Sequence, residues 1–581
     1  MSFSIHYSKN FNKNIRKHLE ANEDLNVTKL QNYYPLYDKF FNLNEKNYNL
    51  INLNNKYQIN SLNSNIDYNN YNATLIDIDN SSNLVNKDIF LKFSPLIDST
   101  KYLLGKLENE NNIFDLPKKD NKTYYPKYLD TNNLSYVDSF FTYLTSKILY
   151  QHKFVHGLDY YGSFLGIKKN FKIDVGDEIE LLEESDFFNK NLNVLFDISE
   201  DYYEYSNNDS RKYKKNIKIG DSLTNLNIEI LDTLENDNTL ENDNTLENDN
   251  TLENDNTLIF DNIIKSKLKN NKSTHSNSTS DCSSRSSDTD NENDSEEDDS
   301  EQDGSEEDGS DSEDGSDSED GSEDDIKIYS TIKEFPVQII ALEKCNNTLD
   351  YLLENKLINN DELGAILMQI ILILISYQKM FNFTHNDLHT NNIMYIETDI
   401  QYLYYFYNDK YYKVPTYGKI FKIIDFGRAI YSFKNELMCS DSFCFINGDA
   451  STQYNFGPYY DKSKKEITPN YSFDLCRLAC SIFDFIIDDI SEVEEMTDEV
   501  YKIIIDWCKD DKNRNVLYKN NGEERYLEFK LYKMIARTVH NHLPHEQLNR
   551  SYFNKFKVSK KKLKPLNFKK LINIQEFPSY I

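Results

Sequence analysis

Residues 385–392 read His-Asn-Asp-Leu-His-Thr-Asn-Asn, and residues 424–427 read Ile-Asp-Phe-Gly. The first stretch places a carboxylate, Asp387, five positions before an amide, Asn392, and the second places another carboxylate, Asp425, just before a Phe-Gly pair. Mg²⁺ in proteins takes oxygen ligands of these kinds, and a carboxylate can also accept a proton from a hydroxyl. Together the two stretches indicate phosphoryl transfer, in which positioning and charge neutralisation supply most of the catalysis.

The spacing of these residues resembles the catalytic motifs of the eukaryotic-type protein-kinase superfamily. Asp387 with Asn392 is similar to the D-x-x-x-x-N catalytic loop, and residues 425–427 are similar to the metal-binding turn that follows it. The chain looks like a divergent member, comparable to haspin-like kinases or to serine/threonine kinases of giant viruses. The resemblance implies an α+β, two-lobed protein-kinase-like fold. It has a small β-rich N-lobe, a larger helical C-lobe and a long disordered acidic insertion.

The resemblance also implies a role for each residue of the two motifs. Asp387 would orient the acceptor hydroxyl and take its proton, and Asn392 would hold one Mg²⁺. Asp425 would join Mg²⁺, or Mn²⁺, to the β- and γ-phosphates of ATP. His389 replaces the Lys of most Ser/Thr kinases. It can help to neutralise the γ-phosphate only if its imidazole is protonated or donates through an N–H.

The segments around the motifs carry hydrophobic patterns that predict regular structure. Phe421, Ile423 and Ile424 form a short apolar run expected to be a buried strand, with residues 393–396 as its partner. Residues 361–381 carry apolar side chains at helical spacing, which predicts a buried helix just before the loop. We do not expect this helix to span a membrane, because Gln369 interrupts its apolar run.

A lysine and an acidic partner are expected upstream of the motifs. Residues 89–93 resemble the third N-lobe strand, whose Lys92 would pair with the α- and β-phosphates; the alternative is an exposed Lys on an ordinary strand. Residues 135–150 are the best following helix, with apolar residues along one face. Its one carboxylate, Asp138, is therefore the expected partner of Lys92, although kinases use the longer Glu at this point.

Two more segments resemble kinase elements. Residues 337–342 resemble the last N-lobe strand, so that the backbone of Glu343 and Cys345 would meet adenine. Asp474 opens a further apolar helix. It resembles the buried Asp that holds the catalytic-loop backbone in kinases, and an ordinary helix N-cap is the equal alternative.

The chain departs from the kinase pattern in several places. Residues 61–79, which precede Lys92, contain no glycine, so the Gly-rich loop is missing. The Asn-rich turn at 69–72 can instead adopt the left-handed conformations that Gly usually supplies. Asn386 stands where many kinases carry Arg, and no Ala-Pro-Glu segment follows residue 427. Regulation by a phosphorylated activation loop is therefore not expected.

These departures keep two alternatives open beside an ATP-dependent Ser/Thr protein kinase. The Asp-Leu-His pattern at 387–389 also resembles small-molecule kinases of the aminoglycoside and choline type, whereas Asp-Phe-Gly favours a protein substrate. A pseudokinase, which acts as a scaffold without turnover, would explain the missing Gly-rich loop. The geometry of Lys92 discriminates between them, because an active enzyme needs it to face Asp425 and a second carboxylate such as Asp138.

The charge of the chain is concentrated in one window. The 581 residues carry a formal charge of −32, and residues 233–325 hold 32 acidic and 5 basic residues. Four Thr-Leu-Glu-Asn-Asp-Asn repeats (233–256) and a tract of Ser, Asp, Glu and Gly (273–325) make up most of this window. Neither part can bury a core, which predicts disorder and a possible basic partner.

The remaining composition sets the organisation and the environment of the chain. Seven cysteines without a C-x-x-C pair, and residues 1–14 without an apolar core, predict an intracellular, cytoplasmic protein; if viral, it belongs to the host cytoplasm or the virion. Alternating tyrosines at 402–412 predict a β-hairpin rather than a nucleic-acid platform. The expected parts are an N-terminal extension (1–54), the first part of the N-lobe (55–232), the insertion (233–325), the last N-lobe strand and hinge (326–345), the C-lobe (346–540) and a basic tail (541–581).

Overall fold

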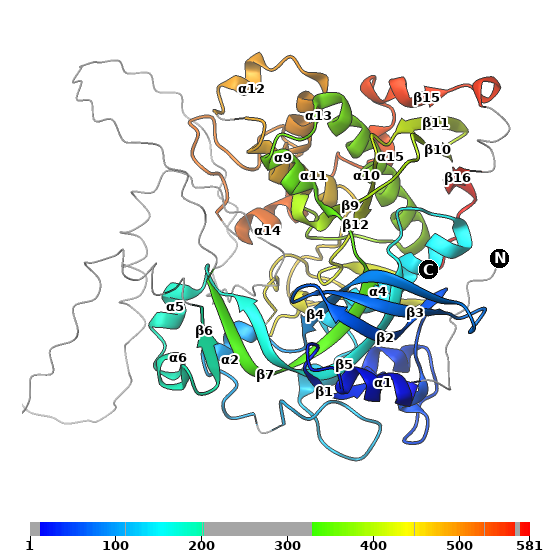
Figure 1. The fold of residues 1–581 in the computed structure, drawn as a ribbon. Coiled ribbons are helices and arrows are strands. Elements are labelled where there is room, and N and C mark those ends of the chain that lie inside the picture. The colour runs from blue at the N-terminus through cyan, green and yellow to red at the C-terminus, as the bar shows by residue number, and fades with distance from the viewer. Residues whose placement is uncertain are drawn as a thin grey trace, which may run out of the picture. The chain divides into compact units, whose positions relative to one another are not determined.

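The N-terminal part of the chain builds a curled antiparallel sheet in the computed structural model (Figure 1). The structure describes residues 12–199 except 111, residue 202, and residues 328–581 except 447, 488, 528 and 564–569. All of these residues fall within one compact unit of the chain. The insertion expected at 233–325 lies outside the described residues. The expected α+β class is confirmed, because helices dominate after the sheet.

The sheet has seven strands in the order β1-β5-β7-β4-β3-β2, and β6 pairs with β7. Their bounds are β1 (Val27–Gln31), β2 (Tyr57–Asn65), β3 (Asn70–Asp77), β4 (Leu84–Pro95), β5 (Tyr160–Asp174), β6 (Phe196–Ile198) and β7 (Tyr329–Glu343). The strands predicted at 89–93 and 337–342 lie in β4 and β7, which pair with each other. Segment 1–54, expected as an extension, supplies β1.

Alternation along β4 decides where Lys92 points. Ile89, Leu91 and Phe93 are buried, whereas Lys92 between them is partly exposed. Successive side chains of a strand point to opposite faces, so the apolar residues hold one face in the core and leave the lysine on the other. Lys92 lies opposite Ile340 of β7, which fixes its position in the middle of the sheet.

The Asn-rich turn between β2 and β3 differs from the expectation. None of the residues 69–72 has a positive φ, so the predicted left-handed conformation is wrong. The carboxylate of Asp67 accepts hydrogen bonds from the backbone N–H of Asn69 (2.9 Å) and of Asn70 (2.8 Å). This side chain closes the turn locally, and no glycine-like backbone is needed.

Helix α4 (Leu134–His152) lies in the chain between β4 and β5 of the sheet and confirms the helix predicted at 135–150. The side chain of Asn133 accepts a hydrogen bond from the N–H of Ser135 (3.1 Å) at its N-terminus, and Lys153 (φ 53°) ends it. The helix is buried on all sides from Ser135 to Ile148. It therefore has tertiary partners on every face, and Asp138 must find its hydrogen bonds inside the protein.

Helix α10 (Asn360–Phe381) precedes the loop at 385–392 and confirms the helix predicted there. A capping box of Asn359 and Glu362 starts it, and Asn382 (φ 51°) ends it. Among the described residues, α10 is the one helix with the length and hydropathy of a membrane span, and 94% of its most apolar window is buried. Gln369 accepts a hydrogen bond from the N–H of Phe421 (3.1 Å). This burial is consistent with a core helix.

Small sheets frame the two motifs. The predicted pair is confirmed as β9 (Ile393–Glu397) and β12 (Lys419–Ile423), which are antiparallel, and β8 (Asn347–Thr348) extends it. The predicted hairpin is β10 (Tyr402–Tyr407) with β11 (Lys410–Pro415). Two strands of segment 541–581, which we expected as a tail, join this hairpin. They are β15 (Lys557–Val558) and β16 (Leu571–Asn573); β13 (Ile430–Phe433) pairs with β14 (Glu436–Cys439).

The remaining helices surround these sheets. The longer ones are α11 (Phe473–Phe483), α13 (Glu499–Trp507), α14 (Phe529–Thr538) and α1 (Asn12–Glu20). The shorter ones are α2 (Ser99–Leu103), α3 (Pro126–Leu129), α5 (Ile179–Glu183), α6 (Asp186–Asn191), α9 (Leu349–Glu354), α12 (Glu492–Glu495) and α15 (Pro544–Gln547). Helix α11 confirms the helix predicted to start near Asp474.

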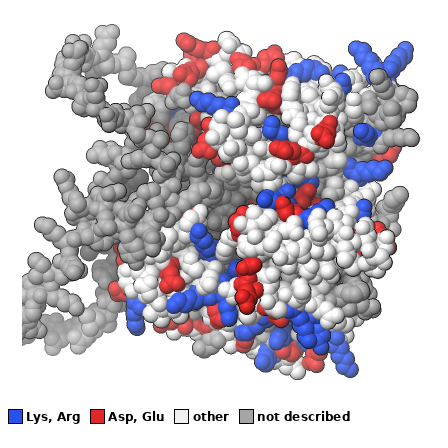
Figure 2. Space-filling model, viewed as in Figure 1, with Lys and Arg blue, Asp and Glu red and all other residues white. Residues whose placement is uncertain are grey.

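Charged side chains of both signs are interspersed on the face shown in Figure 2. This mixture agrees with the sequence, in which basic and acidic residues nearly balance outside residues 233–325. Lysines gather near β15, where Lys557, Lys560, Lys561 and Lys562 lie close together in the chain (Figure 2). The face shown therefore carries a mixture of both signs.

Candidate functional site

Lys92 forms the centre of a group of three charged side chains. Its Nζ lies 2.8 Å from Oδ2 of Asp138 and 2.9 Å from Oδ1 of Asp425. The three residues come from β4, from α4 and from the turn that follows β12. Lys92 thus makes both contacts that the sequence analysis expected of an active enzyme, one with Asp425 and one with Asp138. The arrangement brings together residues that are far apart in the chain, and it aims a cation at the metal-binding candidate Asp425.

The two carboxylates that share Lys92 have different electrostatic environments. Burial is the largest influence on Asp138 and raises its pKa above the usual value, although Lys92 lowers it; the nearby Asp425 carboxylate raises it further. For Asp425, burial also raises the pKa, but the charge and hydrogen bond of Lys92 together with His385 lower it by more, so its pKa lies below the usual value. Oδ1 of Asp138 additionally accepts a hydrogen bond from the N–H of Phe426 (2.9 Å). Asp425 is thus the carboxylate that keeps its negative charge most firmly.

Packing of Phe426 holds the turn at 425–427 in place. Asp425 has a positive φ of 59°, which is uncommon for a residue other than glycine. Phe426 is fully buried, and its ring lies 4.7 Å from that of Phe141 on α4. The N–H of Ile424 donates to the carbonyl of Asn392 (3.0 Å). The core contacts around Phe426 therefore hold an unfavourable backbone conformation that presents Asp425 to Lys92.

Asp474 holds the backbone of the 385–392 loop. Its carboxylate accepts hydrogen bonds from the N–H of His385 (2.9 Å) and from the N–H of Asn386 (2.9 Å). The N-cap of α11 is Ser472, so the alternative of Asp474 as an ordinary N-cap is wrong. Asn386 (φ 66°) is further fixed by the hydroxyl of Tyr454, which donates to its Oδ1 (2.8 Å). Side chains from other segments thus define the loop that carries Asp387.

Asp387 is partly buried in this loop, and both of its carboxylate oxygens have a partner. The hydroxyl of Tyr532 on α14 donates to Oδ1 (2.7 Å), and Nη1 of Arg428 lies 3.7 Å from Oδ2. Burial raises the pKa of Asp387, but Arg428, His389 and Arg477 lower it by more, so the pKa lies well below its usual range. Asp387 is therefore ionised at neutral pH and can accept a hydrogen bond from a hydroxyl.

Asn392 and His389 form the other half of the loop. Nδ2 of Asn392 donates to the carbonyl of Asp387 (2.9 Å) and lies 3.0 Å from Nε2 of His389. Burial lowers the pKa of His389 to about 4, so its imidazole is neutral near pH 7. With Nε2 accepting from the amide, Nδ1 carries the proton. Of the two options in the sequence, this geometry favours an N–H donor over a protonated ring.

Two oxygens fit a hard divalent cation. Oδ1 of Asn392 is buried and has no hydrogen-bond partner among the described residues, an arrangement that is costly unless a ligand supplies one. The carboxylate of Asp425 supplies the second oxygen ligand expected for the cation. Within the described parts of the chain, no cluster of three or more His, Cys, Asp or Glu forms a closed metal cage. This set suits Mg²⁺ or Mn²⁺, which complete their shell with water and phosphate oxygens.

The segment expected to meet adenine is organised by a buried lysine. The N–H of Glu343 donates to the carbonyl of Asp159 (2.9 Å), and Nζ of Lys422 pairs with the Glu343 carboxylate. The N–H of Cys345 makes no hydrogen bond to any described residue. Burial raises the pKa of the Cys345 thiol to about 12, so it is not a nucleophile. Of the expected pair, only Cys345 offers a free backbone N–H.

Several residues that contact the candidate site were not predicted from the sequence. Arg428 follows Gly427 directly and could have been found from that position, whereas Tyr532 lies 145 residues from Asp387 and carries no local signal. Lys422 is buried at a core-facing position of β12. In the sequence, a lysine at such a position suggests a strand that faces solvent. Long-range contacts of this kind do not leave a periodic signature.

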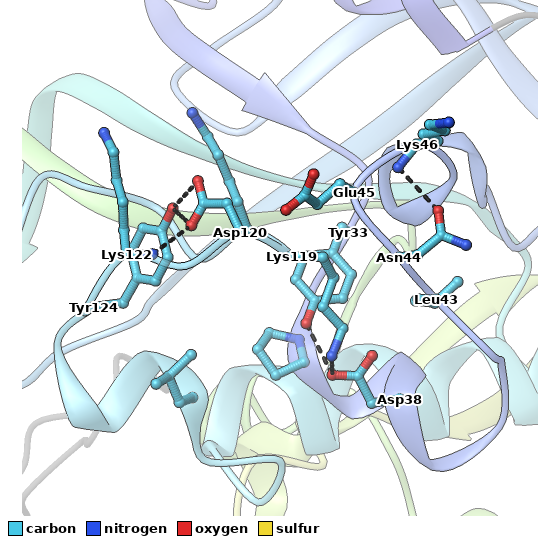
Figure 3. A pocket seen from close by; sticks show the side chains of 13 residues that line it. Tyr33, Asp38, Leu43, Asn44, Glu45, Lys46, Lys119, Asp120, Lys122 and Tyr124 are labelled. Carbon is cyan, nitrogen blue, oxygen red and sulfur yellow. Dashed lines mark hydrogen bonds and ion pairs between the residues drawn. The ribbon is translucent and has the colours of Figure 1, made fainter.

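A separate pocket of about 880 Å³ lies away from all of these residues (Figure 3). The segments 33–46 and 118–129 line it. Some of its polar side chains contact one another: Lys119 contacts Asp38 (2.8 Å), and the hydroxyl of Tyr124 donates to Asp120 (2.9 Å). The pocket contains no residue predicted from the motifs.

Comparison with known proteins does not add to this description. No family model matches the chain, and no curated protein matches it.

Proposed function

We propose that this chain is an ATP-dependent protein kinase that transfers the γ-phosphate of ATP to a Ser or Thr hydroxyl. The observation that carries the proposal is the ion-pair group in which Lys92 contacts both Asp138 and Asp425. A lysine on a sheet that meets a helix carboxylate and a metal-binding Asp is the arrangement that phosphoryl transfer from ATP requires. No single ordinary structural role accounts for all three residues.

The proposed fold is the two-lobed one of protein kinases. The seven-stranded sheet with α4 would be the N-lobe, and α10, α11 and the sheets around the motifs would belong to the C-lobe. The segment from Glu343 to Cys345 joins β7 to the later elements and would be the hinge that meets adenine. The free N–H of Cys345 supports this assignment, because adenine needs a backbone donor there.

Each motif residue has a role in the proposed reaction. Lys92 would hold the α- and β-phosphates once it leaves one of its carboxylates, and Asp425 with Asn392 would hold Mg²⁺, which neutralises phosphate charge. Asp387 would orient the acceptor hydroxyl and take its proton. The Nδ1–H of His389 would hydrogen-bond a phosphate oxygen. The low pKa of Asp387 makes it a positioning group as much as a base.

One observation favours a pseudokinase scaffold as the second candidate. The hydroxyl of Tyr532 occupies one acceptor position of Oδ1 of Asp387, so an external acceptor must share or displace this hydrogen bond to use the same oxygen. A scaffold would tolerate this contact permanently. The unpartnered Oδ1 of Asn392 argues for the enzyme, because a protein with no need for a cation gains nothing from a buried, unsatisfied amide oxygen.

The test is transfer of labelled γ-phosphate from ATP with Mg²⁺ or Mn²⁺ to protein acceptors. We expect transfer by the full chain and its loss in Asp387→Asn and Asp425→Asn. Asp489→Asn is the matched control, because Asp489 is exposed on a different segment. Nucleotide binding without transfer to any protein would favour the scaffold, and transfer to an aminoglycoside or choline instead would replace the protein substrate.

A further inference from the structure

The hydroxyl that contacts Asp387 belongs to the chain itself. Tyr532 on α14 donates its O–H to Oδ1 of Asp387 at 2.7 Å. Burial raises the pKa of this phenol, so it carries its proton at neutral pH. Among the described residues, it is the one hydroxyl that donates to this carboxylate. An acceptor substrate must offer its hydroxyl to the same oxygen before transfer.

The ring of Tyr532 is held by neighbours on several elements. The guanidinium of Arg477 on α11 lies 5.0 Å from the ring centroid, and that of Arg428 lies 5.7 Å away. Phe529 stacks on the ring at 5.5 Å, with an interplanar angle of 13°, and Phe473 lies 6.2 Å away. Cations over an aromatic face and a stacked ring favour this rotamer over a solvated one. These contacts of the ring therefore hold the Tyr532 hydroxyl against Asp387.

The charges around Tyr532 also suit its phosphorylated form. Arg428 and Arg477 stand on the ring, and each guanidinium offers donors in a geometry that matches phosphate oxygens. A tyrosine phosphate would bring a charge of about −1.5 to −2 next to these two cations. It would also stand beside the Asp387 carboxylate, which repels it and so favours departure of the modified side chain from the catalytic carboxylate.

We propose that Tyr532 is an intramolecular phosphate acceptor of this site, so that the enzyme accepts a phenolic as well as an aliphatic hydroxyl. This inference rests on the proposed kinase function. The Tyr532 oxygen forms a bond to the γ-phosphorus of ATP while the bond from that phosphorus to the β,γ-bridging oxygen breaks. The phenol proton passes to Asp387, and ADP leaves with the bridging electron pair.

The experiment incubates the full chain with ATP and Mg²⁺ and follows phosphate on Tyr532 by peptide mass spectrometry. We expect modification at a rate that does not depend on protein concentration, because the acceptor is in the same molecule. Tyr532→Phe removes the phosphate at this position, and Asp387→Asn abolishes it. Tyr526→Phe, six residues earlier, is the matched control and leaves the phosphorylation of Tyr532 unchanged.

A mixing experiment separates transfer within one molecule from transfer between two. The Tyr532→Phe chain, which keeps Asp387, is incubated with the Asp387→Asn chain, which keeps Tyr532. We expect no phosphate on Tyr532 of the second chain. Its appearance there would overturn the intramolecular proposal while leaving the kinase intact.

Three other results would also overturn the inference. Transfer to added protein with Tyr532 unmodified would leave the proposed function standing but reject the acceptor role. An increase in transfer to added protein by Tyr532→Phe, without any phosphate on Tyr532 of the unsubstituted chain, would assign the residue to blocking only. Absence of transfer to every acceptor by a chain that binds ATP would reject both proposals.

Discussion

The lysine side of the candidate site (Lys92, Asp138 and Asp425) and its acceptor side (Asp387, His389 and Asn392) are organised in different ways. On the lysine side, one ammonium pairs with two carboxylates, and the three residues come from three elements. On the acceptor side, a hydroxyl of the chain fills the hydrogen-bonding position of the carboxylate, and one amide oxygen has no partner among the described residues. The first side is held by two short ion pairs, whereas the second combines hydrogen bonds and packing with a longer contact between Arg428 and Asp387 (3.7 Å).

This difference predicts how each side responds to change. Charges that compensate one another in a buried site are strongly coupled, so removing one member leaves the others unpaired. Neutral hydrogen bonds are individually weaker and are lost one at a time. Substitutions on the lysine side should therefore cost more stability than those around the acceptor loop.

The largest effect is expected for Lys92→Met. Removing the ammonium leaves Asp138 and Asp425 facing each other in a buried site, and we expect the free energy of unfolding to fall by about 3–5 kcal/mol. Lys87→Met is the matched control on the same strand, because Lys87 is more exposed and lies 3.8 Å from its partner Asp159. Its cost should be within about 1 kcal/mol. Chemical denaturation of both variants measures the difference, and equal losses would show that the lysine side is not charge-coupled.

A smaller effect is expected for Asp138→Asn. The amide oxygen can still accept the N–H of Phe426, and Asp425 still pairs with Lys92. Because burial disfavours the charge on Asp138, its removal should cost about 1–2 kcal/mol of the free energy of unfolding. Asp138→Glu serves as the charge-conserving control in the same denaturation experiment. A loss as large as that of Lys92→Met would mean that Asp138, rather than Asp425, carries the main ion pair.

The residues of both sides were predicted from the sequence, whereas the side chain that contacts Asp387 was not. The resemblance of residues 89–93 to a kinase strand identified Lys92, and Asp138 was found because its helix contains no other carboxylate. Such signals are local, since strand and helix periods repeat within a few residues. Tyr532 comes from a helix far along the chain, so only tertiary packing brings it to Asp387. The left-handed backbone predicted for the turn at Asn69 is wrong because the carboxylate of Asp67 closes this turn by accepting a backbone hydrogen bond.

The acceptor side should show its own dependence on pH through His389. Burial lowers the pKa of His389 from 6.5 to about 4, which means that the unfolded chain binds the proton more tightly. Stability from this group is thus fully present above pH 6.5 and is lost as the pH falls toward about 4. The expected slope is about 1 kcal/mol per pH unit within this window.

Comparison with a variant isolates this slope from other titrating groups. His156 is buried with a pKa lowered to about 4 in the same way, so it contributes a parallel slope that remains in His389→Asn. Denaturation of both proteins across the window should give a shallower pH dependence for the variant. Identical slopes would show that His389 is solvated or protonated in the folded protein and would revive the alternative of a charged imidazole at the phosphate.

The smallest effect is expected for Tyr454→Phe, which tests how the acceptor loop is held. This change removes the hydroxyl that donates to Oδ1 of Asn386 (2.8 Å) but keeps the ring in the core. We expect the free energy of unfolding to fall by about 1 kcal/mol, because one buried hydrogen bond is lost. Asp474 still binds the two backbone N–H groups of the loop, so phosphate transfer should fall only slightly. A severe loss of transfer with little loss of stability would instead place Asn386 among the residues that position Asp387, and would make the acceptor side as tightly coupled as the lysine side.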